Sequence, residues 1–134
     1  MPTYVDSSVI ISALKDETRT QDAQEFLMSA DELLTSWLTY VEVRRNIWQS
    51  PNVGMAKRAR KELDEQMERI ELVAIVEADW RSAADIAELT QLKSLDAVHV
   101  AIANKFNPDD MKFLTFDKKQ AEVARQLGFA VVGA

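Results

Sequence analysis

Cysteine is absent from this sequence of 134 residues, and only three glycines occur in it. Without cysteine the chain has no disulfide, no thiolate zinc site and no cysteine nucleophile. None of the glycines belongs to a phosphate-binding pattern such as GxGxxG or GxxxxGK[ST]. A nucleotide-binding Rossmann domain is therefore disfavoured.

Long hydrophobic runs and excess positive charge are also missing. No apolar segment approaches the roughly 20 residues that a membrane span needs, and the N-terminal MPTYVDSSVI has no basic segment of the kind that begins a signal peptide. We therefore expect a cytoplasmic protein without membrane contact. The net charge of −6 argues against a surface that coats nucleic acid. It is compatible with a nucleic-acid enzyme whose carboxylates bind divalent cations, since the ions reverse the local charge.

Composition and length predict one globular domain over residues 1–134, because the chain is 47% hydrophobic and 28% charged. Short apolar segments predict five strands, at residues 3–5, 33–35, 72–75, 112–115 and 130–132. Periodic segments predict helices at residues 8–15, 21–30, 37–49, 51–69, 78–90, 96–106 and 117–127. This alternation is typical of an α/β fold with a mostly parallel sheet and helices on both faces.

The segment SLDAVHVAIA, residues 94–103, is apolar on nearly every side and predicts a buried helix. Ser94 is expected to cap this helix, which places Asp96 in its first turn. Two interpretations of Asp96 follow. It could stabilise the helix N-terminus, where negative charge is favourable, or it could stand at the edge of the core for chemistry.

Three further carboxylates occupy comparable positions. Asp6 directly follows the first predicted strand, Asp117 follows the fourth, and Glu42 lies in a mostly apolar helix. Ligands of open α/β sheets bind beyond the carboxyl ends of the strands, where Asp6 and Asp117 are expected.

Each of these acids also has a purely structural interpretation. Asp6 and Asp117 could be helix caps, and Gln120 would complete a capping box with Asp117. Glu42 has capping-box spacing from Thr39, although Ser36 is the better helix start.

At least three of the four acids map to the same edge of the sheet, and Glu42 could reach it from its helix. Carboxylates clustered in this way would repel one another unless a cation joined them. Oxygen ligands favour a hard divalent ion, so the pattern predicts Mg²⁺, with Mn²⁺ as a possible substitute. The single histidine, His99, disfavours a metal-free reaction, in which two histidines usually share acid–base catalysis. Because His99 lies one turn from Asp96 on the buried helix, we expect it to be a hydrogen-bonded core residue.

Four segments carry a family resemblance. VDSSVI, SWLTYVEVRRN, LKSLDAVHVAIA and LTFD resemble, in order, the signature blocks of PIN-domain ribonucleases. The likeness is strongest to VapC-type toxins of prokaryotic toxin–antitoxin pairs, and it extends over essentially the whole chain.

The resemblance implies a Rossmann-like, three-layer α/β/α sandwich and Mg²⁺-dependent cleavage of RNA that leaves a 5′-phosphate and a 3′-hydroxyl. It also implies a homodimer and inhibition by a cognate antitoxin. Asp6, Glu42, Asp96 and Asp117 match the family's acidic site, and Thr115 matches a hydroxyl position that supports it.

Substrate and partner contacts have weaker signals. Arg44 and Lys118 lie near Glu42 and Asp117 in the sequence and could bind RNA phosphates, although each could equally be an ordinary solvated charge. The helix at residues 51–69 has a narrow apolar stripe and is expected at the surface, where an antitoxin segment could cross it. The three tryptophans, at helical spacing, are expected in the core.

Other functions are also compatible with the sequence. One is a PIN nuclease outside a toxin–antitoxin pair that processes RNA or acts on DNA. Another is a catalytically silent binding domain of the same fold, which the complete acidic quartet disfavours. A receiver-like signalling domain normally has paired acids early in the chain and a lysine after a late strand. Here Asp6 stands alone, and residues 130–134 contain no lysine.

Overall fold

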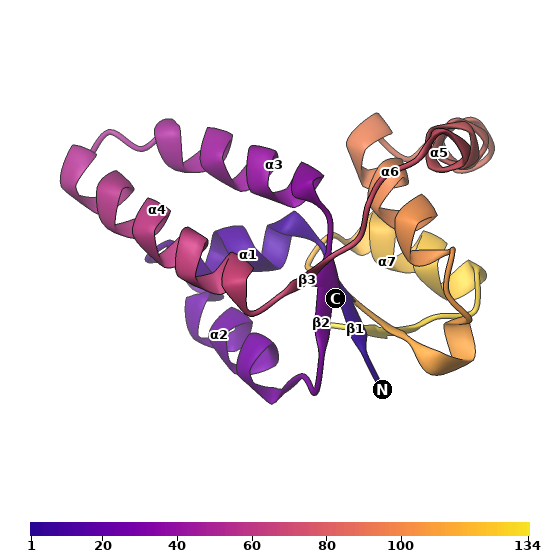
Figure 1. Ribbon diagram of the computed structural model, residues 1–134, viewed down its shortest axis with the longest axis horizontal. Helices are drawn as coiled ribbons and strands as arrows, with labels where there is room; N and C mark the ends of the chain where they lie inside the picture. The colour runs from indigo at the N-terminus through magenta and orange to yellow at the C-terminus, as the bar shows by residue number, and fades with distance from the viewer.

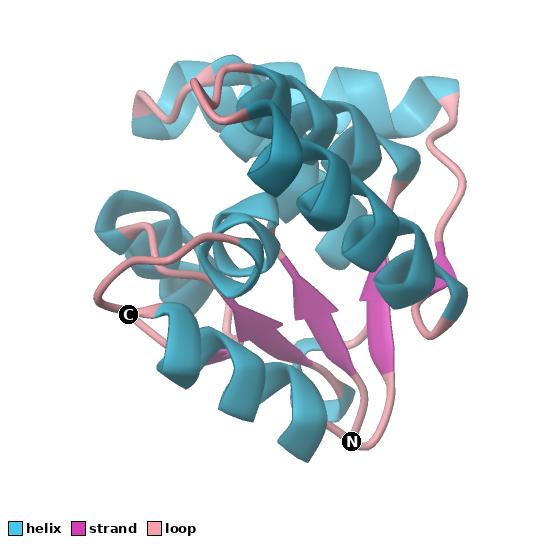
Figure 2. Cartoon of the chain, turned by 90° about the vertical axis from the view of Figure 1, so that its left-hand side faces the viewer, coloured by secondary structure: helices cyan, strands magenta, loops and turns pink.

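The computed structural model describes residues 1–134, and its centre is a parallel sheet of five strands. The strands are β1 (Thr3–Val5), β2 (Leu33–Thr35), β3 (Glu71–Leu72), β4 (Lys112–Leu114) and β5 (Ala130–Val132). Their spatial order is β3-β2-β1-β4-β5, and every neighbouring pair is parallel. The strands that face the viewer in Figure 2 accordingly point the same way.

Seven helices cover the two faces of this sheet. They are α1 (Ser7–Leu14), α2 (Thr20–Ser29), α3 (Trp37–Trp48), α4 (Val53–Glu68), α5 (Glu77–Thr90), α6 (Ser94–Ala103) and α7 (Lys118–Gln126). A 3₁₀ turn at Pro108–Asp110 precedes β4. In Figure 1 the sheet is nearly edge-on, with α1 to α4 on one side and α5 to α7 on the other. The three-layer α/β/α sandwich predicted from the sequence is confirmed.

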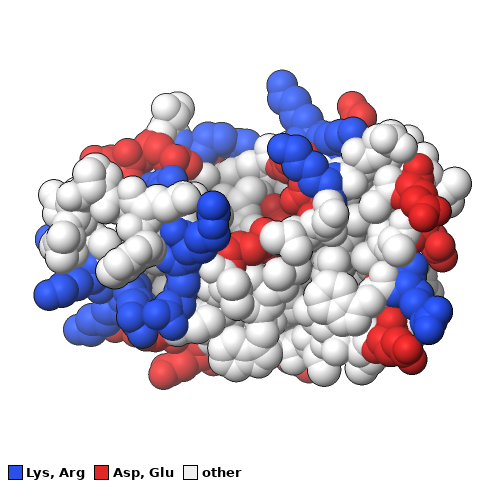
Figure 3. All heavy atoms as spheres, turned by 90° about the horizontal axis from the view of Figure 1, so that it is seen from above, with Lys and Arg blue, Asp and Glu red and all other residues white.

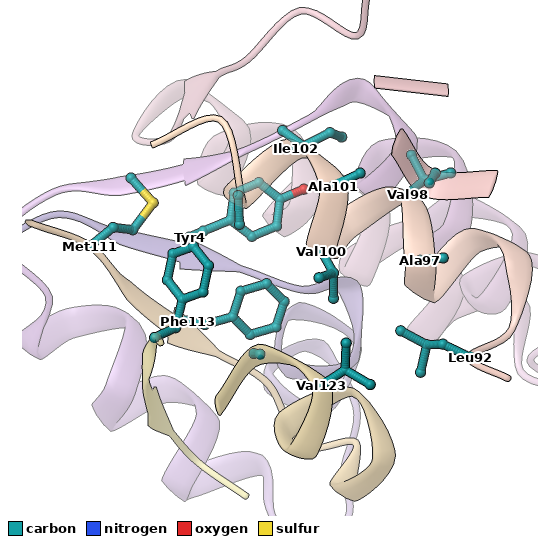
Figure 4. Packing of buried hydrophobic residues seen from close by; sticks show 14 of the residues in the cluster. Tyr4, Leu92, Ala97, Val98, Val100, Ala101, Ile102, Met111, Phe113 and Val123 are labelled. Carbon is teal, nitrogen blue, oxygen red and sulfur yellow. The ribbon is translucent and has the colours of Figure 1, made fainter. Parts of the chain in front are cut away.

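Two hydrophobic cores lie on the opposite faces of the sheet, because successive strand residues point to opposite sides. Tyr4 and Phe113 belong to the core beneath α5, α6 and α7, part of which Figure 4 shows. Their neighbours Val5 and Leu114 belong to the core beneath α1 to α4. All residues of β1 and β2 and two of the three residues of β4 are buried, as expected for the centre of a parallel sheet covered on both faces, whereas β3 and β5 at its edges are partly exposed.

The strand order creates a crevice between β1 and β4. From β1 the chain builds outward through β2 and β3, whereas β4 and β5 are added on the other side of β1. Such a reversal of strand order is where open α/β sheets bind ligands, beyond the carboxyl ends of the strands. The loops that follow β1 and β4 adjoin here, since the Asp6 amide donates to the Leu114 carbonyl at 3.0 Å.

Several predicted helix ends are confirmed by their hydrogen bonds. Asp6 and Ser36 cap α1 and α3 by accepting from the backbone N–H groups two residues on. Gly128, at φ +97°, follows α7 as predicted, and the Gly128 amide bonds the Arg125 carbonyl at 3.0 Å. The Ser94 cap was predicted wrongly. Lys93 is the N-cap of α6 without a side-chain bond, and Ser94 is the first helical residue.

The tryptophans were also predicted wrongly, because all three are largely exposed. Trp37, Trp48 and Trp80 are 58%, 86% and 50% exposed. On α3 the fully buried side chains are Thr39 and Val43, one turn apart. Since residues two apart point to opposite sides of a helix, Trp37 lies on the outer face, and Trp48, three turns along, lies there too.

The third strand is shorter than predicted, since only Glu71 and Leu72 pair with β2. No helix of the fold has both the length and the apolar character needed to cross a membrane.

We predict that Gly133→Ala destabilises the protein by about 1–3 kcal/mol. Gly133 has φ +99°, and a Cβ there would lie 2.6 Å from the Thr115 carbonyl oxygen, at the end of β4. Gly54→Ala is the matched control, because Gly54 lies in the first turn of α4 and its Cβ would meet only Asn52 Oδ1 at 3.4 Å. Chemical denaturation of both variants checks this. Equal stabilities would show that the chain end does not hold the end of β4.

Candidate active site

Asp6 is the most tightly held carboxylate at the carboxyl edge of the sheet. It follows β1, is 2% exposed, and accepts a hydrogen bond from the Ser8 amide at 3.1 Å. Thr115 Oγ1 lies 3.3 Å from the same carboxylate oxygen, and Gln120 Nε2 lies 3.4 Å from the other. Asp6 therefore caps α1 and also faces the loop after β4, so its two predicted roles coexist.

The loop after β4 brings Asp117 and Thr115 to the same place. Asp117 Oδ1 accepts from the Gln120 amide at 2.8 Å and caps α7. The Asp117 amide donates to Thr115 Oγ1 at 3.1 Å. Thr115 is fully buried, and its hydroxyl lies 2.7 Å from Gln120 Oε1, nearer than it lies to Asp6. Since a hydroxyl donates one proton at a time, the shorter contact to Gln120 takes it.

Gln120 joins three parts of the site and was not recognised as a site residue from the sequence. It is fully buried, accepts from Thr115, and donates to Asp6 and to the Asp96 carbonyl, at 3.2 Å. Its backbone amide bonds Asp117. Capping-box spacing from Asp117 was the only sequence signal, and it concerned the helix end rather than the amide side chain.

Glu42 reaches the same edge from the second turn of α3, and His99 of α6 holds it there. His99 Nε2 lies 2.5 Å from Glu42 Oε1 and 3.6 Å from Asp6 Oδ1. The other ring nitrogen, Nδ1, lies 2.8 Å from the Tyr4 hydroxyl. The prediction that His99 is a buried, hydrogen-bonded residue is confirmed, and its partners now place it beside the carboxylates.

The charges around His99 favour its protonated form. Complete burial alone would lower the pKa of the imidazole. The Tyr4 hydroxyl, the hydrogen bond to Glu42 and the charges of Asp6 and Glu42 outweigh burial, so the His99 pKa lies well above its ordinary value.

The charges of the other three acids all act on Asp96, in the first turn of α6. Burial raises its pKa from 3.8 to about 6, helped by the charges of Asp6, Asp117 and Glu42 and opposed only by His99. The structure thus brings the four predicted carboxylates within electrostatic reach of one another, although 111 positions separate Asp6 from Asp117 in the sequence. Figure 3 shows acidic side chains at the bottom of the hollow between the two helical halves.

The chemistry of the donors fits a hard divalent cation. All four side chains offer carboxylate oxygens, and the raised pKa of Asp96 records a repulsion that a cation would relieve. Their present orientations do not form a ready-made ligand set, since no group of three or more acidic or histidine side chains is placed to hold an ion. Asp6, Glu42 and Asp117 instead accept hydrogen bonds from the protein. Binding would require these side chains to reorient within the site.

The two residues predicted to contact RNA lie at the surface, away from direct contact with the carboxylates. Arg44 is exposed and lies over the Tyr40 ring at 5.5 Å. Because residues two apart do not share a helix face, Arg44 points away from Glu42. Lys118 is exposed after Asp117, whereas its neighbour Lys119 bonds the Gln91 carbonyl at 2.8 Å.

Fold and site together define an α/β/α domain with four carboxylates gathered at the crevice between β1 and β4. Comparison with known families agrees with this class. The chain belongs to the PIN domain family, which matches residues 3–126.

Individual relatives are distant but align over almost the full length. Ribonuclease VapC47 of Mycobacterium tuberculosis is 28% identical over 130 residues, covering 94% of this chain and 92% of that protein. Ribonuclease VapC46 of the same species is 25% identical over 129 residues, covering 96% of this chain and 95% of that protein.

Solved structures show the same fold. FitAcB from Neisseria gonorrhoeae matches with a TM-score of 0.69 at 18% identity, covering 96% of this chain and 95% of that chain. VapBC2 from Rickettsia felis, bound to a DNA fragment from its promoter, matches with a TM-score of 0.68 at 12% identity, covering 98% of both.

We predict that Asp96→Asn stabilises the metal-free protein at pH 8 by on the order of 1 kcal/mol, after allowance for solvent screening of this partly buried group. The folded-state pKa of about 6 exceeds the ordinary value of 3.8. The wild type therefore loses stability as pH rises through this interval, and the asparagine variant does not. The difference in stability between the variant and the wild type should vanish below about pH 4. Thermal unfolding in EDTA at both pH values measures it, and a gain independent of pH would contradict the electrostatic explanation.

Proposed function

We propose that this chain is a metal-dependent endoribonuclease and the toxin of a toxin–antitoxin pair. The observation that carries the proposal is the convergence of Asp6, Glu42, Asp96 and Asp117, from four separate elements, at the crevice of the sheet. PIN family membership supports the nuclease assignment. The curated relatives named ribonuclease VapC, which align over at least 94% of this chain, support RNA as the substrate.

The carboxylates would hold one or two Mg²⁺ or Mn²⁺ ions. Such an ion would supply Lewis-acid chemistry, acidifying a water and stabilising the charge of the departing 3′ oxygen. Asp6, Asp96 and Asp117 are the proposed main ligands, and Glu42 lies beside them on the other wall of the crevice. The expected products carry a 5′-phosphate and a 3′-hydroxyl.

The remaining residues of the site restrain these carboxylates. The Ser8 amide and the Gln120 side chain fix Asp6 at the end of β1. Thr115 and the Gln120 backbone amide fix Asp117 after β4. These bonds keep the acids at the crevice, because each acid would otherwise turn toward solvent to escape its neighbours. Lys118, and Arg44 from the outer face of α3, would attract the flanking phosphates of the RNA.

We predict that the purified protein cleaves single-stranded RNA in Mg²⁺ or Mn²⁺, and that EDTA abolishes cleavage. Asp6→Asn and Asp96→Asn should each reduce the rate at least about 100-fold, because each removes a proposed metal ligand. Asp110→Asn is the matched control, since Asp110 lies in the exposed turn before β4. Cleavage that survives EDTA and both substitutions would refute the metal mechanism. Cleavage of DNA in preference to RNA would favour the alternative of a DNA-acting PIN nuclease.

The partner proposed for the toxin is a cognate antitoxin, in keeping with the solved VapBC2 complex, which has the same fold. A hollow of about 670 Å³ between α3 and α4 is the surface that we propose it covers. The apolar residues of this surface are Val41, Ile47, Trp48, Val53 and Ala56. Its basic residues are Arg44, Arg45, Lys57 and Arg60.

Exposure and charge identify the kind of segment that fits. Val41, Trp48 and Val53 are 62%, 86% and 66% exposed, an unusual density of large apolar side chains on a surface. Four positive charges surround them on a chain whose net charge is −6. An antitoxin segment with apolar residues on one side and acidic residues along its edges would complement both features.

We predict that Arg60→Glu weakens binding of the purified cognate antitoxin roughly 3- to 30-fold and that Trp48→Ala weakens it further. Lys61→Glu is the matched control, because Lys61 is exposed on α4 but does not line the hollow. Calorimetric titration measures the affinities. Equal affinities for the Arg60 and Lys61 variants would place the antitoxin elsewhere, and a selective loss of RNA binding would make this surface part of the substrate site.

Assembly and location follow from the same family resemblance. We infer a homodimer in the cytoplasm, and light scattering of the purified chain without antitoxin measures the oligomeric state.

A further inference from the structure

We infer that Tyr4 and His99 form a positioning pair that directs the Glu42 carboxylate into the acidic site. This inference rests on the proposed metal-dependent function. Three residues carry it: Tyr4 in the central strand, His99 in the buried helix α6, and Glu42 on α3, across the crevice. The two contacts join residues 95 and 57 positions apart in the sequence.

Glu42 depends on His99 for its orientation. The carboxylate of Glu42 is 18% exposed, and its one hydrogen bond inside the protein is the 2.5 Å contact with His99 Nε2. Asp6 and Asp117, by contrast, each accept a backbone N–H bond at a helix start. Without His99 the Glu42 side chain would have no protein group to hold it toward the other carboxylates, whose negative charges repel it.

Tyr4 bonds the ring nitrogen of His99 that does not face Glu42. An ionised carboxylate only accepts hydrogen bonds, so Nε2 must carry the proton that faces Glu42. The Tyr4 hydroxyl satisfies Nδ1 in either charge state of the ring. It donates to a neutral imidazole and accepts from an imidazolium. The orientation of Glu42 therefore persists whether or not His99 is charged.

Packing holds the pair rigidly. Both Tyr4 and His99 are fully buried. The Tyr4 ring stacks on the Phe113 ring, with 5.6 Å between their centroids. It meets the His99 ring edge-on, with 5.9 Å between those centroids. Figure 4 shows the Tyr4 hydroxyl directed toward α6 from within this core. Because Tyr4 and His99 have so little freedom to move, they fix Glu42 relative to β1 and α6.

Two amide substitutions separate positioning from simple packing. In His99→Gln the side-chain nitrogen can occupy the place of Nε2 and donate to Glu42. In His99→Asn the shorter side chain reaches only the place of Nδ1. Both replacements are polar, and both remove the ring, so a purely structural role would make the shorter asparagine and the longer glutamine comparable in function.

Magnesium binding, measured by calorimetry on the full chain without RNA, is the first test. We expect His99→Asn to weaken Mg²⁺ binding roughly 10- to 100-fold, and His99→Gln to retain most of the affinity. Tyr4→Phe should weaken it roughly 2- to 10-fold, the effect of one lost hydrogen bond. In a Glu42→Ala background His99→Asn should have no further effect, because His99 acts through Glu42.

Nitrogen NMR of the metal-free chain is the second test, and it is unambiguous because His99 is the only histidine. We expect a protonated Nε2 whose resonance moves in Glu42→Ala, and an Nδ1 resonance that moves in Tyr4→Phe.

The outcomes separate this inference from the proposed function. An unprotonated Nε2, or equal Mg²⁺ affinities for the two amide variants, would overturn the positioning role while metal-dependent cleavage stands. Additive effects of His99→Asn and Glu42→Ala would overturn it as well. A wild type that neither binds Mg²⁺ nor cleaves RNA would refute both together.

Discussion

Mutual repulsion among four carboxylates is the constraint around which this structure is arranged. At Asp96 the charges of three other acids add to the larger effect of burial, and together they raise its pKa to about 6. Such a cluster costs stability in a folded protein unless other groups offset it. The buried side chains of His99 and Gln120 contribute to that offset.

The fold supplies two kinds of compensation. Helix starts stabilise Asp6 and Asp117, because the backbone N–H groups of α1 and α7 point at them. Two buried side chains, Gln120 and His99, supply the second kind by forming hydrogen bonds across the crevice. Gln120 links Asp6 to the Asp96 carbonyl, and His99 links Glu42 to the central strand through Tyr4. The remaining negative charge is what a divalent cation would neutralise.

The positions of Asp6 and Asp117 could be predicted from the sequence because they follow a local rule. Asp6 and Asp117 come directly after strands, and parallel strands end at one edge of a sheet. The alternation of strands and helices likewise predicted the sandwich, and Gly128 predicted the end of α7. These signals depend on residues close together in the chain.

The supporting contacts could not be predicted in the same way. The links of His99 to Tyr4 and Glu42 join residues 95 and 57 positions apart, so no local pattern encodes them. Gln120 was visible only as part of a helix cap. The outward tryptophans of α3 were missed for a related reason. Helical spacing identifies a shared face, but tertiary packing decides whether that face meets the core.

Helix α3 connects the acidic site with the surface between α3 and α4. Glu42 and Trp48 belong to the same helix, α3. One lies at the site, and the other lines the proposed antitoxin surface. A partner bound along the outer face of α3 would thus lie one helix away from the acidic site.

The most direct test of this account is a crystal structure of the protein soaked in Mn²⁺, with anomalous scattering used to locate the ion. The account predicts a Mn²⁺ peak in the crevice between β1 and β4, in contact with carboxylate oxygens of at least two of Asp6, Asp96 and Asp117. Those side chains should have rotated within the site to face the ion. A fully soaked crystal with no peak there, or with Mn²⁺ bound only at the surface, would contradict it.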